Sequence, residues 1–291
     1  MNPQPQGGSG ASPWHDTVRR LRQNRFAVLG LVLLAAFVLA AAFAPGIAPY
    51  PYDQTNLRYG AMPPTRAHLF GTDELGRDLL ARTLYGARIS FAVGLMATLV
   101  SLSIGVTYGS VSAFVGGRTD DVMMRIVDVL YGLPFMFFVI ILMVILGRNI
   151  LNLFIALGAV QWLTMARIVR GQVLSLKGRE FVLSAHALGV PPPRLIVRHL
   201  LPNALGPIVV YATLTVPAVM LEEAFLSFLG LGVQPPMASW GSLAAEGAAA
   251  MEAYPWLIVF PGLTLTVTLL SLNFLGDGLR DALDPQLSRR V

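Results

Sequence analysis

Long stretches without a charged residue restrict the fold of this sequence more than any other feature. An α-helix of about 20 apolar residues, rising about 1.5 Å per residue, crosses the roughly 30 Å hydrocarbon layer of a membrane. With 55% hydrophobic and 13% charged residues, the chain is also more apolar than soluble proteins are. We therefore expect an all-α polytopic membrane protein with six transmembrane helices. The six stretches are Phe26–Phe43, Ile89–Gly117, Val129–Gly147, Ile150–Ala166, Ala204–Leu221 and Trp256–Gly276.

The segments between these stretches give the predicted domain organisation. Residues 1–25 form a polar tail ending in an interfacial helix, and residues 26–44 form the first span. A proline-rich outer loop at 45–88 separates this span from a five-helix core, and the chain ends in a second cytoplasmic tail, 277–291. The core covers 89–277, with spans at 89–117, 127–147, 150–167, 204–223 and 255–276, a cytoplasmic loop at 168–203 and an outer loop at 224–254.

Basic residues are distributed unevenly around the spans. If the N-terminus is cytoplasmic, most of the 21 Lys and Arg residues fall on the cytoplasmic side, and the positive-inside rule then places both termini there. The same arginines account for the pI, and no basic run is interleaved with aromatic residues as in a nucleic-acid-binding protein. Small residues at 40–44 resemble a signal-peptide cleavage site, but the apolar stretch exceeds the roughly 7–15 residues typical of a signal peptide. A retained first span is the favoured interpretation.

The most informative polar segment is Arg170–Asn203, between the fourth and fifth spans. We predict a short helix that starts near Ser175 or Gly178 and stops where Gly189 takes a positive φ at the C′ position. The prolines at 191–193 prevent its continuation. A second short helix is expected over 194–201, ending at Pro202.

The first of these helices has an apolar side. A rigid helix–stop–helix with apolar anchors at helical spacing is suited to a groove on a partner protein. An ordinary interfacial loop is the alternative. The expected anchors are Phe181, Val182, Ala185 and Leu188.

Small residues recur every fourth position along the second span. Such a ribbon lets helix backbones approach closely in lipid, where apolar side chains gain little from meeting one another. The alternative is a glycine-rich helix without a partner. The ribbon consists of Ala97, Ser101, Gly105, Gly109, Ala113 and Gly117.

Polar residues also occur at the outer side. Glu222 and Glu223 are predicted to close the fifth span, where they either line the outer mouth of a pathway or mark the membrane boundary. Near the inner end of the third span, Asp128 is expected to pair with Arg125 or another inner-face cation. The outer loop holds a polar turn that we interpret as structural, with a second role in contacting a soluble protein. This turn consists of Gly71, Thr72, Asp73, Gly76, Arg77 and Asp78.

The sequence argues against several enzymatic and transport activities. The sequence has no G-x-x-x-x-G-K-[ST] phosphate loop, no cysteine, and no H-E-x-x-H or G-x-S-x-G motif. All four histidines lie outside the spans, which argues against an intramembrane hydrolase. A secondary transporter driven by an ion gradient would need ionisable groups near the midplane, whereas Glu222 and Glu223 are expected at the end of their span. We expect no catalytic or metal site in this chain.

Four segments in order resemble the membrane subunits of binding-protein-dependent ABC importers. Leu183-Ser-Ala185, three residues before Gly189 and closed by Leu201-Pro202, resembles their EAA loop. Three others, supported by Arg125 and Asp128 before Pro134, resemble the C-type permease of the peptide/nickel subgroup. They are Phe70–Asp78, then Glu223–Gly232 with Pro235-Pro236 and Trp240-Gly241, and finally Leu279–Asp281 with Leu283–Pro285.

The resemblance implies a type I ABC importer permease fold, with one N-terminal helix on a five-helix core. It implies a transport subunit that forms a heterodimer with a second permease in the bacterial cytoplasmic (inner) membrane. Two ATPase subunits would bind ATP and Mg, and a soluble or anchored protein would deliver the substrate. No cofactor is expected in this chain. Relatives of this kind carry dipeptides, oligopeptides, glutathione or chelated nickel, and the sequence does not choose among them.

In that family the EAA loop is the coupling helix that docks in a cleft of the ATPase. The acidic first residue of the family pattern is Leu183 here, and Glu180, one turn earlier, is a candidate replacement. An exposed ion pair is worth no more than about 1 kcal/mol, so docking does not depend on it. The positions carried over as ATPase-coupling are Glu180, Leu183, Ser184, Ala185, Gly189, Leu201 and Pro202.

Overall fold

The computed structural model describes residues 13–283, and within this range the regular structure is helical. Residues 1–12 and 284–291, which include parts of both predicted tails and the end of the Leu283–Pro285 motif, lie outside the described residues. The helices are α1 Pro13–Gln23, α2 Arg25–Ala42, α3 Ala44–Ile47, α4 Leu79–Val115, α5 Gly117–Tyr131, α6 Phe135–Leu146, α7 Ile150–Lys177, α8 Glu180–Ala187, α9 Pro192–Leu195, a π-helical turn Ile196–Leu200, α10 Leu201–Phe228, α11 Trp240–Ala249 and α12 Trp256–Leu283.

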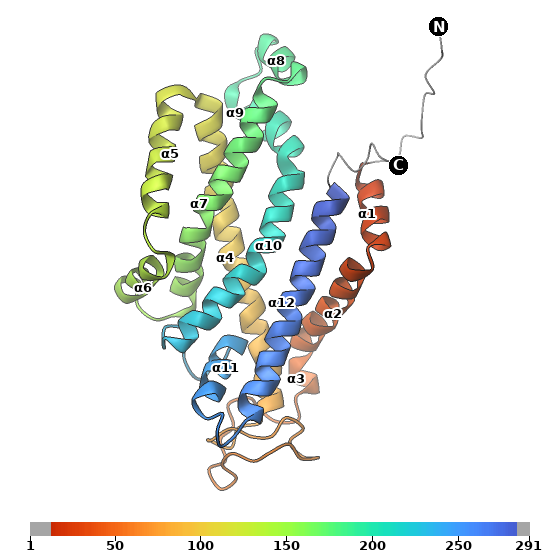
Figure 1. Ribbon diagram of the computed structural model, residues 1–291, viewed down its shortest axis with the longest axis vertical. Coiled ribbons are helices and arrows are strands. Elements are labelled where there is room, and N and C mark those ends of the chain that lie inside the picture. The colour runs from red at the N-terminus through yellow and green to blue at the C-terminus, as the bar shows by residue number, and fades with distance from the viewer. Residues whose placement is uncertain (1–12, 284–291) are drawn as a thin grey trace.

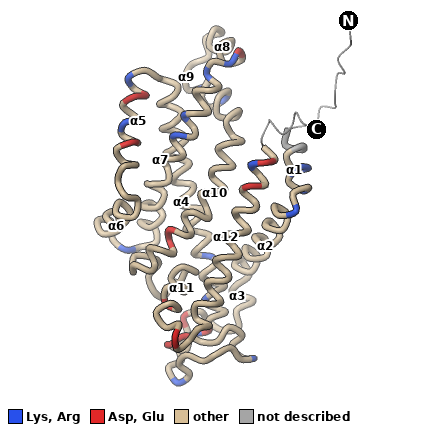
Figure 2. The backbone as a smooth tube through the Cα atoms, in the orientation of Figure 1, with Lys and Arg blue, Asp and Glu red and all other residues tan. Residues whose placement is uncertain are grey.

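The long helices α4, α7, α10 and α12 run side by side, and α2 packs against α12 at one edge (Figure 1). At one end of this bundle lie α1, α8 and the end of α12, and at the other lie α3, α11 and the loop before α4. Charged residues gather at these two ends and along α5, while the middle of the bundle has few (Figure 2). The apolar middle is what a bilayer requires of a bundle that crosses it.

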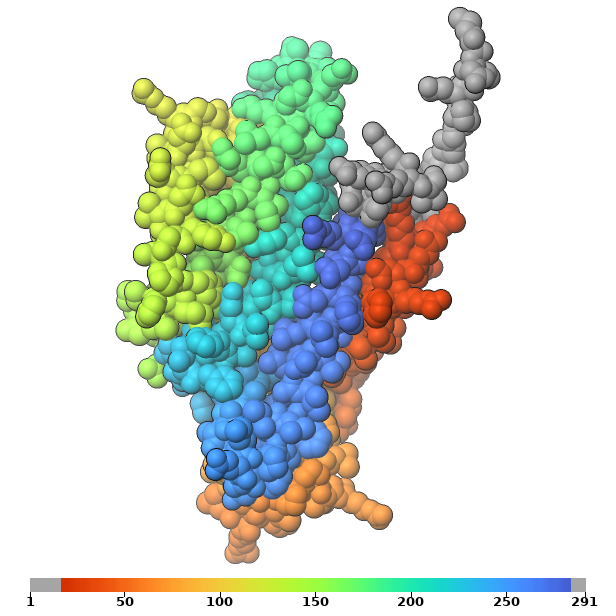
Figure 3. All heavy atoms as spheres, in the orientation of Figure 1, coloured from red at the N-terminus to blue at the C-terminus, as the bar shows by residue number. Residues whose placement is uncertain are grey.

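Five helical segments among residues 13–283 are long and apolar enough to span a membrane: Arg25–Ala42, Leu79–Val115, Ile150–Lys177, Pro192–Phe228 and Trp256–Leu283. The third predicted span, 127–147, is not one helix. Its residues belong to α5 and α6, which meet at 88°. Pro134 explains the break, because a proline disfavours a helical residue before it and cannot donate a backbone hydrogen bond. The bent pair forms the lateral edge of the molecule (Figure 3).

Three helices extend beyond the boundaries predicted for them. The helix α4 begins at Leu79, directly after Asp78 and ten residues before the predicted second span. The helix α7, which contains the predicted fourth span, continues past residue 167 to Lys177. The second short helix does not end at Pro202, which lies in the first turn of α10. A proline is tolerated there because the first turn of a helix has no internal partner for its N–H groups.

The packing of α4 against α7 forms the centre of the fold. The predicted small residues Ala97, Ser101, Gly105, Gly109 and Ala113 are all buried. A Cβ on Gly105 would lie 2.6 Å from the Cβ of Met165, and one on Gly109 would clash with the backbone carbonyl of Ala166. The ribbon ends earlier than predicted, because Gly117 begins α5.

Candidate functional site

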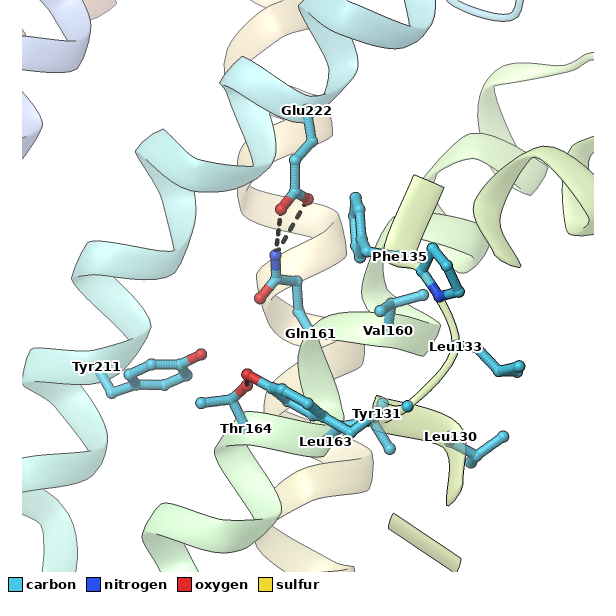
Figure 4. A pocket seen from close by; sticks show the side chains of 12 residues that line it. Leu130, Tyr131, Leu133, Phe135, Val160, Gln161, Leu163, Thr164, Tyr211 and Glu222 are labelled. Carbon is cyan, nitrogen blue, oxygen red and sulfur yellow. Dashed lines mark hydrogen bonds between the residues drawn. The ribbon is translucent and has the colours of Figure 1, made fainter. Parts of the chain in front are cut away.

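A cavity of about 600 Å³ opens between α7, α10 and the linker that joins α5 to α6 (Figure 4). Its walls combine apolar side chains with a few hydroxyl and amide groups, and Glu222 carries the only formal charge among the described residues that line it. The lining residues are Leu130, Tyr131, Gly132, Leu133, Pro134, Phe135, Val160, Gln161, Leu163, Thr164, Tyr211 and Glu222.

Glu222 of α10 and Gln161 of α7 point toward each other across the cavity wall (Figure 4). The Gln161 Nε2 group donates hydrogen bonds to both carboxylate oxygens of Glu222, at 2.8 and 3.0 Å. No Lys or Arg among the described residues forms an ion pair with this carboxylate. Glu222 therefore presents a half-buried negative charge that only a neutral amide partly satisfies.

Tyr211 of α10 lines this cavity. It also lines a second, more apolar cavity of about 470 Å³, which Gly206 and Pro207 of α10 border together with Arg280 near the end of α12. Because both cavities contact Tyr211, they follow α10 in succession from Glu222 toward the end of the molecule that carries α8. Tyr211 therefore contributes to the walls of both cavities.

Polar residues on α7 continue from the cavity toward the C-terminal end of this helix. Gln161 is followed at intervals of three by Thr164, Arg167 and Arg170. Thr164 Oγ1 lies 3.5 Å from the Tyr131 hydroxyl, and the Arg167 guanidinium lies over the Tyr131 ring at 4.3 Å from its centroid. These contacts attach α5 to α7 by polar side chains.

The partners of the two α7 arginines are aspartates of α5. Asp128 pairs with Arg167 at 2.7 Å and not with Arg125. Arg170 donates two hydrogen bonds to Asp120, at 2.7 and 2.6 Å. The Lys177 ammonium, at the end of α7, donates hydrogen bonds to the Ala113 and Phe114 carbonyls near the end of α4, which holds these two helix ends together.

The short helix α8 begins at Glu180, later than the predicted start near Ser175 or Gly178. The predicted glycine stop is confirmed, since Gly189 has a φ of +79°. Its N–H donates to the His186 carbonyl at 3.0 Å, and the Val190 N–H donates to the Ala185 carbonyl at 3.1 Å. This pair of bonds is the Schellman motif, which ends a helix at a left-handed residue.

The predicted apolar face of α8 is divided. Val182 and Ala185 are buried against the molecule's own core, so they are not anchors for a partner, which corrects the prediction. Phe181, Leu183 and Leu188 are exposed, at 42%, 55% and 85%. Of the other predicted coupling residues, Glu180, Ser184, Gly189 and Pro202 are exposed and Leu201 is half-buried.

The predicted outer turn ties four segments together. Asp73 Oδ1 accepts hydrogen bonds from the backbone N–H groups of Leu75 and Arg77, and its Oδ2 pairs with Arg77 at 2.7 Å and with the buried Arg82 at 2.6 Å. Arg82 also pairs with Glu246 of α11 at 2.8 Å. The charges of the turn are therefore satisfied within the molecule.

The remaining residues of the turn shape the start of α4. Asp78 caps α4 by accepting from the N–H of Ala81 at 2.7 Å, and it pairs with His68 at 2.8 Å. The Thr72 carbonyl accepts from the indole of Trp256 in α12. Gly71 and Gly76 have φ values of +81° and +71°, which side-chain-bearing residues rarely adopt.

Glu222 and Glu223 do not act as a pair. Glu223 is 1% exposed and accepts hydrogen bonds from Ser227 at 2.8 Å and Ser239 at 2.7 Å, so it faces α11 and not the cavity. Its prediction as a pathway-mouth residue is wrong. Both residues also lie farther from the helix end than expected, because α10 continues to Phe228.

The residues that contribute to these sites but were not predicted include Arg82, Gln161, Tyr211 and Glu246. The three-residue spacing of polar groups from Gln161 to Arg170 is a signal that was present in the sequence. No comparable pattern connects Arg82 with Glu246, which are 164 positions apart.

A profile of the family described as "Binding-protein-dependent transport system inner membrane component" matches residues 105–289. The chain belongs to this family. A second profile, the "N-terminal TM domain of oligopeptide transport permease C", matches residues 12–64. The two matches together include α2, the α4–α7 pair from Gly105 onward, α8, α10 and α12.

Similar proteins include permeases named for peptide transport. The oligopeptide transport system permease protein OppC of Haemophilus influenzae is 51% identical over 95% of this chain and 90% of its own length. The OppC of Bacillus subtilis is 49% identical over 96% and 91%, and the dipeptide permease DppC of the same organism is 48% identical over 94% and 86%.

A solved structure has the same fold. A chain of the methionine ABC transporter MetNI, in an inward-facing conformation, superposes with a TM-score of 0.57 over 70% of this chain and 96% of its own length, at 18% identity. The chain thus has the type I ABC importer permease fold, in agreement with the prediction.

As a member of this family, the protein is a multi-pass membrane permease subunit of a binding-protein-dependent ABC importer, and it works with other components of that importer. It is a transport subunit rather than an enzyme. Membership of this family argues against the ion-gradient transporter. The position of Glu222 no longer does, because α10 continues to Phe228 and Glu222 is not at the end of its helix.

Proposed function

We propose that this permease carries short peptides and forms one half of their route across the bacterial inner membrane. The observation that supports this most strongly is the 51% identity, over 95% of the chain, to a permease named for oligopeptide transport. The cavity fits the same substrate class. Its apolar walls suit diverse side chains, and its amide and hydroxyl groups suit a peptide backbone.

The other half is supplied by a second, different permease, and two ATPase subunits bind ATP and Mg²⁺ on the cytoplasmic side. In this arrangement both termini and α8 are cytoplasmic, in line with the excess of basic residues predicted for that side. The exposed Phe181, Leu183 and Leu188 of α8 are the apolar anchors for the ATPase cleft, and Glu180 supplies the nearby charge. This chain itself holds no cofactor.

The test is uptake by the complete assembly in proteoliposomes. A radiolabelled tripeptide is loaded on the cognate binding protein, and unlabelled dipeptide, oligopeptide, glutathione or a nickel chelate is added as competitor. We expect ATP-dependent uptake that short peptides suppress. Suppression by the nickel chelate or by glutathione, with none by peptides, would assign a different substrate.

A further inference from the structure

The hydrogen bonds and exposure of Glu222 differ from those expected of a carboxylate with a purely structural role. Its neighbour Glu223 shows the structural arrangement, fully buried with two hydroxyl donors from its own and an adjacent helix. Glu222 instead has a single amide donor and faces open space. An ionised carboxylate has about four lone-pair positions for hydrogen bonds, so its capacity is only partly used.

The residues around this carboxylate favour a cation as its additional partner. No other described residue lining the cavity is charged, so the local field is negative. Burial away from water strengthens the attraction between Glu222 and an incoming positive group. The carboxylate is therefore poised to bind a cation that arrives with the substrate.

The geometry favours an ammonium group over a metal ion. Among residues 13–283, no group of three or more His, Cys, Asp or Glu side chains is close enough to hold a metal. An ammonium has three donors and no acceptor. The Glu222 carboxylate and the side-chain oxygen of Gln161, whose amide nitrogen already binds Glu222, offer acceptors from two helices at one place (Figure 4).

We propose that Glu222 and Gln161 form a transit site for the protonated amino terminus of a peptide, an inference that rests on the proposed function. The amino terminus is common to peptides of any sequence, so a site that reads it does not restrict the side chains. The apolar wall formed by Leu133, Phe135 and Val160 then accommodates the side chains without selecting among them.

The experiment compares two forms of one tripeptide, the free-amine form and its des-amino analogue, in proteoliposomes that contain the complete importer. Uptake of both is measured for the unmodified protein and for Glu222→Gln, Glu222→Asp and Glu252→Gln. Glu252 is an exposed outer-side glutamate, so its variant removes the same charge away from the cavity. The binding protein is identical in every sample, so its own preference cancels when variants are compared.

We expect Glu222→Gln to lower uptake of the free-amine peptide about tenfold relative to the des-amino peptide, because a hydrogen bond to a charged group is lost. Glu222→Asp should retain part of the discrimination, and Glu252→Gln all of it. Complex yield should stay unchanged in all variants, and Glu252→Gln should also leave basal ATP hydrolysis unchanged.

Three results would overturn the inference: unchanged discrimination in Glu222→Gln, an equal loss of both peptides, or loss of assembly, which would mean that Glu222 pairs with the second permease. Failure of the unmodified importer to take up either peptide would instead overturn the proposed function, and this inference with it.

Discussion

A single residue ends α8, the helix that we propose docks on the ATPase. Gly189 has a left-handed backbone, and a Cβ added to it would meet nothing within 4 Å. The requirement for glycine there is therefore conformational and not steric. Asparagine tolerates this backbone better than other residues with side chains.

Replacement of Gly189 should test the role of α8. We expect Gly189→Glu to strain the helix stop by about 1–2 kcal/mol and to displace the exposed Leu188 beside it. Basal ATP hydrolysis should persist, whereas its stimulation by loaded binding protein should fall severalfold. Gly189→Asn serves as the control and should retain most of the stimulation. Normal stimulation in Gly189→Glu would show that coupling does not pass through this stop.

The buried charges of the outer turn make a separate prediction. Asp73→Asn removes one of the two carboxylates that satisfy the guanidinium of Arg82, which is 1% exposed. Weakening a buried charged hydrogen bond should lower stability by about 1.5–3 kcal/mol. Thermal unfolding of the detergent-solubilised protein measures this loss. Glu74→Gln, at an exposed neighbouring position, should have little effect, and equal effects of both variants would contradict the structural role.

The sequence could not predict which of the adjacent residues Glu222 and Glu223 faces the cavity. Glu222 and Glu223 are chemically identical, but consecutive residues on a helix point about 100° apart. One therefore faces the cavity and the other faces α11. Which of the two faces the cavity depends on the position of α11, and no local pattern encodes that position.

At the scale of helices, hydropathy predicted most elements, and several helices extend beyond the predicted spans. Charged residues were treated as span boundaries, yet Arg82 and Arg170 lie within α4 and α7 because each is paired with an aspartate. The break between α5 and α6 at Pro134 was missed because every residue around it is uncharged. A proline in an apolar run was the available signal.

The close contact between α4 and α7 can be tested by substituting a glycine at the interface. Gly105→Leu should force the helices apart, because even a Cβ at this position would lie 2.6 Å from Met165. Overpacking of this kind costs about 1–3 kcal/mol or more. The yield of assembled complex in detergent should fall. Gly171→Ala on α7, where a Cβ meets nothing within 4 Å, is the control. Unchanged yield for Gly105→Leu would show that this contact does not limit assembly.

At the scale of the whole molecule, α1, α8 and the end of α12 lie together at one end of the bundle (Figure 1). The orientation of this end in the membrane is a prediction from basic residues, and it is directly testable because the chain has no cysteine. A membrane-impermeant maleimide added to intact spheroplasts should label Met251→Cys, at the α11 end. It should label Leu188→Cys, which is 85% exposed, only after lysis. The opposite pattern would invert the topology.

The central claim is that this chain is a permease half without an energy source of its own. The most direct test is peptide uptake in liposomes that contain both permeases and loaded binding protein, with or without the ATPase subunits. We predict accumulation of labelled peptide only when the ATPase subunits and ATP are both present. Accumulation against a gradient by the permeases alone would contradict the account.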